Sequence, residues 1–220
     1  MTVLIAPSVL AADFAHLADE IRRVEDGGAD LIHVDVMDGH FVPNLTLGIP
    51  IVEALRRVTG LPLDVHLMIE NPDRYVAAFA RAGASVIAVH AEACPRLDET
   101  LARVHDLGVK ASVAINPETP ASSLNQVAAR LDAVVLMSVH PGFTGQSFIP
   151  ESVAKIREVR ALLDSHGSAA RIEVDGGVGL SNAATIVAAG ATILVGGAGI
   201  FHTPDPAAAV RALRAAAEGT

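Results

Sequence analysis

Short apolar runs alternate with alanine-rich segments of helical periodicity along the whole chain. Eight runs of four to seven residues, rich in β-branched and aliphatic side chains, predict strands that are buried on both faces. These runs are Val3–Pro7, Leu31–Val36, Leu63–Met68, Val86–His90, Lys110–Ile115, Ala133–Val139, Arg171–Val174 and Thr192–Val195. The periodicity between and after them predicts helices near residues 13–26, 50–59, 72–82, 95–107, 120–129, 150–165, 181–189 and 205–217.

This alternation predicts parallel strands joined by right-handed crossovers, because each helix must pack back onto the sheet that its two strands share. Eight such units within 220 residues favour a (β/α)8 TIM barrel, an α/β fold in which helices surround a closed parallel sheet. A doubly wound open sheet is the alternative. No linker rich in Pro, Gly or Ser divides the chain, so we expect residues 1–220 to form a single (β/α)8 barrel domain.

Composition and charge restrict the class of protein. A hydrophobic content of 51% with 19% charged residues excludes a disordered chain. The net charge of −9, with no basic stripe, argues against a nucleic-acid or membrane-surface partner. The single cysteine, Cys94, excludes an intramolecular disulfide and fits a reducing compartment. Because no secretory signal or long apolar run is present, we expect a cytoplasmic protein with no membrane partner.

Ionisable residues stand inside or directly after several predicted strands, where the active site of a barrel lies. His33 and Asp35 are two residues apart in one strand and therefore share a face. His66 lies near the end of the next strand, and Asp175 follows the seventh. Two imidazoles and two carboxylates suit a divalent ion such as zinc, manganese or iron. The alternative is that these residues are hydrogen-bonded members of the core.

Glycine-rich segments follow the last three predicted strands, at 141–146, 175–177 and 196–199. Glycine lets backbone N–H groups approach an anion, so consecutive loops of this kind predict a phosphate site, whereas each alone is also typical of a turn. Met37, Met68 and Met137 lie near strand ends and predict an apolar lining above the metal, with ordinary core packing as the alternative.

The segment 33–44, His-Val-Asp-Val-Met-Asp-Gly-His-Phe-Val-Pro-Asn, resembles the signature of the ribulose-phosphate 3-epimerase family. Other segments resemble the same family in order and spacing, and the resemblance covers nearly the whole chain. They are Ala6–Ser8, Asp64–Pro72, Met137–Val139 with Pro141–Gln146, and Glu173–Gly177.

The resemblance implies a ribulose-phosphate-binding type of barrel that interconverts D-ribulose 5-phosphate and D-xylulose 5-phosphate, commonly as a homo-oligomer (dimer or hexamer). It implies one divalent ion per subunit (zinc, iron, manganese or cobalt), bound by His33, Asp35, His66 and Asp175. It implies that Asp35 and Asp175 are the acid/base catalysts. The implied contacts to the sugar phosphate are Ser8, His66, Gly142, Phe143, Thr144, Gly145, Asp175, Gly176, Gly177, Gly197 and Ala198.

The chemistry of epimerisation accounts for this arrangement. Inverting C3 of a 2-ketose requires removal of a proton next to the carbonyl and return of a proton to the opposite face of a planar enediolate. Two carboxylates on strands two and seven can face each other across a barrel mouth, one as base and one as acid. A metal ion would stabilise the charge that develops.

Two positions depart from the family pattern. His140 stands where the family usually has Asn before Pro-Gly-Phe, and Ala198 stands where it often has Ser. Both bear on substrate preference and phosphate affinity rather than on the reaction class. The loop Pro141–Gln146 is expected to close over the substrate, with a rigid turn as the alternative.

Three other functions remain open on the sequence. The nearest is 3-epimerisation of a six-carbon ketose phosphate such as allulose 6-phosphate. A barrel lyase or synthase would typically require a lysine, but Lys110 begins its strand and Lys155 lies within a helix. A non-enzymatic protein that binds metal or sugar phosphate would have no evident use for an acid/base pair.

Overall fold

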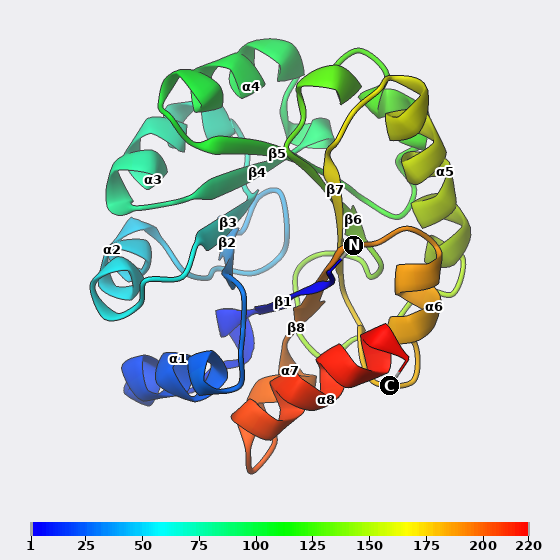
Figure 1. Cartoon of the computed structure of the whole chain (residues 1–220). Helices are drawn as coiled ribbons and strands as arrows, with labels where there is room; N and C mark the ends of the chain where they lie inside the picture. Colours follow the sequence, from blue (N-terminus) through cyan, green and yellow to red (C-terminus); the bar gives the residue numbers. More distant parts are fainter. Residues whose placement is uncertain (1, 220) are drawn as a thin grey trace.

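Eight parallel strands form the centre of the molecule, and helices surround them (Figure 1). The computed structural model describes residues 2–219. The strands are β1 (Leu4–Pro7), β2 (Ile32–Met37), β3 (Leu63–Met68), β4 (Val86–His90), β5 (Lys110–Ile115), β6 (Ala133–Met137), β7 (Arg171–Asp175) and β8 (Ile193–Gly196).

The strand order makes this sheet a barrel. Consecutive strands pair from β2 to β8, and β8 also pairs with β1. Between β1 and β2, an isolated parallel bridge joins Ser8 to His33 and brings the ring close to closure. The predicted (β/α)8 barrel is therefore confirmed, and the doubly wound open sheet is wrong.

The α-helices follow the strands in sequence and lie outside the ring (Figure 1). They are α1 (Leu17–Asp26), α2 (Ile49–Val58), α3 (Val76–Ala82), α4 (Leu97–Asp106), α5 (Ser152–Ser165), α6 (Ala183–Ala188), α7 (Ala198–Phe201) and α8 (Pro206–Glu218). Of the helices in residues 2–219, none combines the length and apolarity that a bilayer-spanning segment requires.

The helix predicted near 120–129 is wrong. Two 3₁₀ helices, Ala121–Leu124 and Ala128–Arg130, occupy this connection between β5 and β6. Ser122, Ser123 and Asn125 are poor residues for a helix interior because their side chains compete for nearby backbone groups. This competition favours short 3₁₀ turns over a continuous α-helix.

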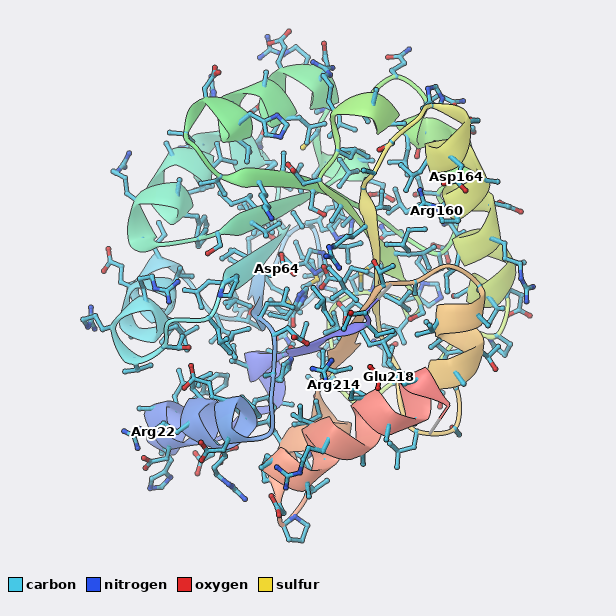
Figure 2. The ribbon with its side chains drawn as sticks, in the orientation of Figure 1. Arg22, Asp64, Arg160, Asp164, Arg214 and Glu218 are labelled. Atoms are coloured by element: carbon cyan, nitrogen blue, oxygen red, sulfur yellow. The ribbon has the colours of Figure 1, made fainter. Side chains whose placement is uncertain are left out.

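Side-chain contacts of α8, the last helix, hold it against residues near the beginning of the chain. Arg214 of α8 donates a hydrogen bond to the carbonyl of Val3 at 2.7 Å, and its guanidinium forms an ion pair with Asp30 at 2.6 Å. Figure 2 shows Arg214 on the side of α8 that faces the first strand. This contact holds α8 beside β1 and β2. These are the two strands that only an isolated bridge joins.

Alternation along three strands positions the polar residues. In β2, Ile32, Val34 and Val36 pack in the core between sheet and helices, and the residues between them point into the barrel. The same alternation holds in β3 and β7, whose outward residues are Leu63, Val65, Leu67, Ile172 and Val174. Polar side chains of β2, β3 and β7 therefore meet inside the ring, whereas the interior near β4, β5 and β6 includes an apolar cluster.

Candidate active site

The four predicted metal ligands converge inside the barrel. One ligand atom from each of His33, Asp35, His66 and Asp175 lies within 4.8 Å of the other three. Asp35 Oδ1 is 3.2 Å from His33 Nε2 and 3.3 Å from His66 Nδ1. Asp175 Oδ2 lies 3.8 Å and 3.7 Å from the same two nitrogens. The structure thus brings together residues from three different strands around one point.

This donor set fits a divalent cation. Both imidazoles are completely buried, and among the described residues His66 Nδ1 finds no hydrogen-bond partner. An unpartnered nitrogen that faces two carboxylate oxygens is costly unless a further group binds there. Imidazole nitrogens with carboxylate oxygens are the ligands that zinc and related ions take.

The surroundings give the carboxyl groups of Asp35 and Asp175 different pKa values. Burial opposes ionisation of Asp35, but the charge of His33 and its hydrogen bond to the carboxylate hold the pKa of Asp35 well below its usual value. Burial, followed by repulsion from Asp35, raises the pKa of Asp175 to about 7. In the metal-free protein near neutral pH, Asp35 therefore carries a negative charge while Asp175 retains its proton to a substantial extent.

His33 is supported from below by two buried carboxyl groups that the sequence analysis missed as site residues. Its Nδ1 lies 3.0 Å from Asp64 Oδ2 and 2.9 Å from Glu173 Oε1. Figure 2 labels Asp64 inside the ring of strands. Because the carboxylate of Asp64 accepts the Nδ1 proton, Nε2 is left for a metal. Burial and repulsion from Asp64 raise the pKa of Glu173 well above its ordinary value.

His66 is oriented by different residues, His90 and Glu92, which were also not predicted as site residues. Its Nε2 lies 2.9 Å from Nε2 of His90, the last residue of β4, and His90 Nδ1 lies 3.2 Å from Glu92 Oε2. Burial lowers the pKa of His90 to about 4, so its ring is neutral at pH 7. A signal for these residues was present: Asp64 and Glu173 precede predicted ligands by two positions, and His90 ends the neighbouring strand.

A cavity of about 230 Å³ opens above this cluster. The predicted site residues reach it except His33 and His66, which are fully buried. Those that line it are Ser8, Asp35, Met37, Met68, Met137, Gly142, Phe143, Thr144, Gly145, Asp175, Gly176, Gly177, Gly197 and Ala198. Lining residues that were not predicted include Leu10, Val139, Gln146, Val195 and Gly199. The three methionines thus border the cavity.

One side of the cavity is built from backbone. None of its lining residues is a lysine or arginine, so an anion there would depend on N–H groups. Close packing explains the glycines: a Cβ on Gly176 would lie 2.5 Å from a methyl group of Val139, and one on Gly177 would collide with the backbone of Phe148. Both glycines also have positive φ.

The two departures from the family pattern have different surroundings. Ala198 lines the cavity. His140 is not among the lining residues, and Nδ1 of its exposed ring lies 3.3 Å from Glu118 Oε1. In this structure the side chain of His140 thus lies at the surface rather than beside the site.

Solved structures with a similar fold come from several enzyme families. They include a 3-hexulose-6-phosphate synthase (TM-score 0.71, 20% identity, covering 98% of this chain and 99% of that one). Another is the orotidine 5'-phosphate decarboxylase from Pyrococcus horikoshii OT3 (TM-score 0.72, 20% identity, covering 99% and 100%). At these identities the comparison establishes the barrel fold alone.

Sequence comparison is more specific. The profile of the ribulose-phosphate 3 epimerase family matches residues 4–201. The ribulose-phosphate 3-epimerase of Bacillus subtilis is 53% identical over 213 residues, which cover 96% of this chain and 98% of that protein. The Escherichia coli K12 protein of the same name is 50% identical, with coverage of 92% and 90%. The chain therefore belongs to the ribulose-phosphate 3-epimerase family.

Proposed function

We propose that this protein epimerises D-ribulose 5-phosphate to D-xylulose 5-phosphate at C3. The observation that carries the proposal is the convergence of Asp35 and Asp175 with two histidines beneath a cavity that has glycine loops on one side. The family supports the choice of substrate, because relatives about half identical to this chain are named ribulose-phosphate 3-epimerase.

The two aspartates would move the protons. Asp35 would accept the C3 proton from one face of the sugar, and Asp175 would deliver a proton to the opposite face. The product differs from the substrate only in the configuration at C3. In the reverse reaction the two residues exchange roles, so each must be able to hold and release a proton.

His33 Nε2, His66 Nδ1 and one oxygen each of Asp35 and Asp175 would hold a divalent ion (zinc, iron, manganese or cobalt). When bound, this ion supplies Lewis acidity that stabilises negative charge developing next to the ketone. Met37, Met68 and Met137 offer no proton that could be given to the wrong face. Ser8 donates a hydrogen bond to Asp35 Oδ2 at 2.5 Å, and so also orients the carboxylate beside which the sugar would bind.

The glycine loops would receive the phosphate group. Their backbones line the cavity at Gly142, Gly145, Gly176, Gly177 and Gly197. With a net charge of −9 over the whole protein, local amide dipoles have to attract the phosphate.

We further propose that residues 1–220 act as one domain, in the cytoplasm, as a homo-oligomer (dimer or hexamer). The reducing-compartment composition and the family resemblance support these assignments.

Metal removal combined with an epimerase assay tests the proposal. We expect the purified protein to contain a divalent ion, and ribulose 5-phosphate turnover to be lost after chelation and restored by adding the ion back. Full turnover by rigorously metal-free protein would exclude the metal role. Allulose 6-phosphate in the same assay tests the six-carbon alternative, since a higher kcat/KM for that sugar would make it the better substrate.

A further inference from the structure

A series of hydrogen-bonding groups leads from His66, inside the barrel, to the loop that follows β4. The rings of His66 and His90 are nearly parallel, at an interplanar angle of 20°, and their Nε2 atoms are 2.9 Å apart. The other nitrogen of His90 lies 3.2 Å from Glu92 Oε2. The remaining oxygen, Oε1, accepts hydrogen bonds from the N–H of Asn116 at 2.8 Å and from the hydroxyl of Thr119.

The direction of each hydrogen bond in this series follows from Glu92, the residue at its outer end. A carboxylate only accepts hydrogen bonds, so the contact between Glu92 and His90 requires a proton on His90 Nδ1. A neutral imidazole has one N–H, which leaves His90 Nε2 as an acceptor. The Nε2 of His66 must then donate to it.

At the inner end of the series, Nδ1 of His66 consequently carries no proton. With its proton on Nε2, His66 presents the lone pair of Nδ1 to the space shared with Asp35 and Asp175. This agrees with the observation that Nδ1 has no hydrogen-bond partner among the described residues. A proton on Nδ1 would instead point at Asp35 Oδ1, 3.3 Å away, and would occupy the position of the metal.

We propose that Glu92, acting through His90, fixes the tautomer of His66 and thereby makes Nδ1 available as a metal ligand. Glu92 is a positioning residue, since it contacts neither the ligand set nor the cavity. The inference rests on the metal site of the proposed function. It also distinguishes the two histidines, because His33 is oriented directly by Asp64 whereas His66 depends on a group two links away.

The substitution Glu92→Gln should reverse the direction of the hydrogen bonds in this series. The N–H of Asn116 and the hydroxyl of Thr119 both need an acceptor, so they would retain the carbonyl oxygen of the new side chain. The amide NH₂ would then face His90 Nδ1 and donate to it. His90 would have to carry its own proton on Nε2, and the proton of His66 would move to Nδ1.

The experiment measures metal affinity and tautomer separately from activity. We expect E92Q to bind zinc ~10- to 100-fold more weakly than the wild type in a chelator competition, the usual cost of losing such an outer partner. In ¹⁵N-labelled metal-free protein at pH 8, the imidazole shifts of His66 should show the proton on Nε2 in the wild type and on Nδ1 in E92Q.

Two control variants separate positioning from loop stability. Thr119→Val removes a donor to Glu92 Oε1 but keeps the carboxylate, so it should lower Tm while leaving zinc affinity unchanged. Glu99→Gln alters an exposed carboxylate that pairs with Arg96 and should change neither quantity.

Three results would overturn the inference. An unchanged zinc affinity in folded E92Q would contradict it while leaving the proposed function intact, and so would a proton on His66 Nδ1 in the metal-free wild type. A wild-type protein that binds no divalent ion would remove the metal site and this inference together.

Discussion

At the scale of single residues, Asp35 and Asp175 show how surroundings give chemically identical groups different tasks. Asp35 accepts hydrogen bonds from the imidazole of His33 and from the Ser8 hydroxyl, and both favour its ionised form. Asp175 is farther from both histidines and is repelled by Asp35. The difference leaves one carboxylate and one largely protonated carboxyl group in the metal-free site, which is the pairing that the proposed acid/base roles require.

Asp35→Asn and Asp175→Asn should each abolish net epimerisation. Inversion needs a proton relay on both faces, and loss of one acid or base typically costs about 10² to 10⁴ in rate. Loss of a metal ligand should deepen the defect. The measurement is kcat for xylulose 5-phosphate formation, with circular dichroism to verify the fold and Asp164→Asn, on the surface of α5, as a matched control. Either variant, folded and within about threefold of wild-type activity, would refute the two-aspartate assignment.

The sequence could predict the clustering of the proposed ligands because strand periodicity fixes which residues share a face. His33 with Asp35, and His66 on the adjacent strand, needed no further information. The supports could not be predicted in the same way. The contacts of His33 to Asp64 and Glu173 depend on how neighbouring and distant strands are staggered around the ring, which apolar periodicity alone does not reveal.

At the scale of elements, strands and long helices were predictable, and short connections were not. The strand runs β3, β4 and β5 begin and end where the sequence predicted them, because strands buried on both faces are rich in apolar residues. The segment after β5 carries apolar residues at helical spacing yet forms only 3₁₀ turns. The end of β6 also differs from expectation: the strand stops at Met137, and Ser138 donates to the backbone oxygens of Asp175 and Gly176 instead.

The loop Pro141–Gln146 combines features of a movable cover with a few tethers. Gly142 and Gly145 have φ of 135° and 77°, and Phe143 is 57% exposed beside the cavity. Asn44 donates a hydrogen bond to the carbonyl of Gly142 at 2.7 Å, and Gln146 donates to the carbonyl of His140 at 2.7 Å. Few contacts would have to break for Phe143 to swing over the opening.

We predict that phosphate binding drives this loop to close. Binding energy from the phosphate would then assist the chemical step, so free ribulose should show a lower kcat than ribulose 5-phosphate, as well as a higher KM. Protease cleavage within 141–148 should slow when ribulose 5-phosphate is bound. Equal kcat values for the two sugars, with no protection of the loop, would mean that it is a fixed turn.

At the scale of the whole molecule, the barrel concentrates its polar interior on one group of strands. The strands β2, β3 and β7 point most of the ionisable groups inward, and His90 at the end of β4 adds one more. Small or apolar residues such as Ala88, Ala114 and Val135 fill the rest of the interior from β4, β5 and β6. Buried charges of this kind reduce the stability of the metal-free fold, since each requires a partner. The continuous apolar layer between sheet and helices has to offset that cost.

This arrangement predicts that stability depends on pH and metal together. The folded protein raises the pKa of Asp175 to about 7, because burial and the charge of Asp35 disfavour its anion. Burial opposes a charge on His33, but the charge of Asp35, together with hydrogen bonds to Asp35, Asp64 and Glu173, raises the pKa of that imidazole well above its ordinary value. Both groups bind a proton more tightly when folded than when unfolded. The stability that these protons confer is therefore lost as pH rises from about 4, the ordinary carboxyl value, through the folded pKa values.

A bound divalent ion replaces those protons, so its stabilising effect should grow with pH. We expect the Tm of the metal-free protein to fall between pH 5 and pH 8, and the rise in Tm on adding zinc to be larger at pH 8 than at pH 5. Asp38 and Glu92, whose pKa values are lowered, lose their contributions only at more acidic pH. Burial lowers the pKa of His90 to about 4, so below about pH 6.5 its contribution opposes this trend. Glu173, whose pKa is raised like that of Asp175, adds to the trend in the same range, so the net fall in Tm is expected to remain. Differential scanning calorimetry of wild type and Asp175→Asn checks the prediction, since the variant lacks the titrating carboxyl and should show a flatter metal-free profile. A zinc-induced shift that is the same at both pH values would indicate that the ion does not compete with protons at these residues, and would place it elsewhere in the molecule.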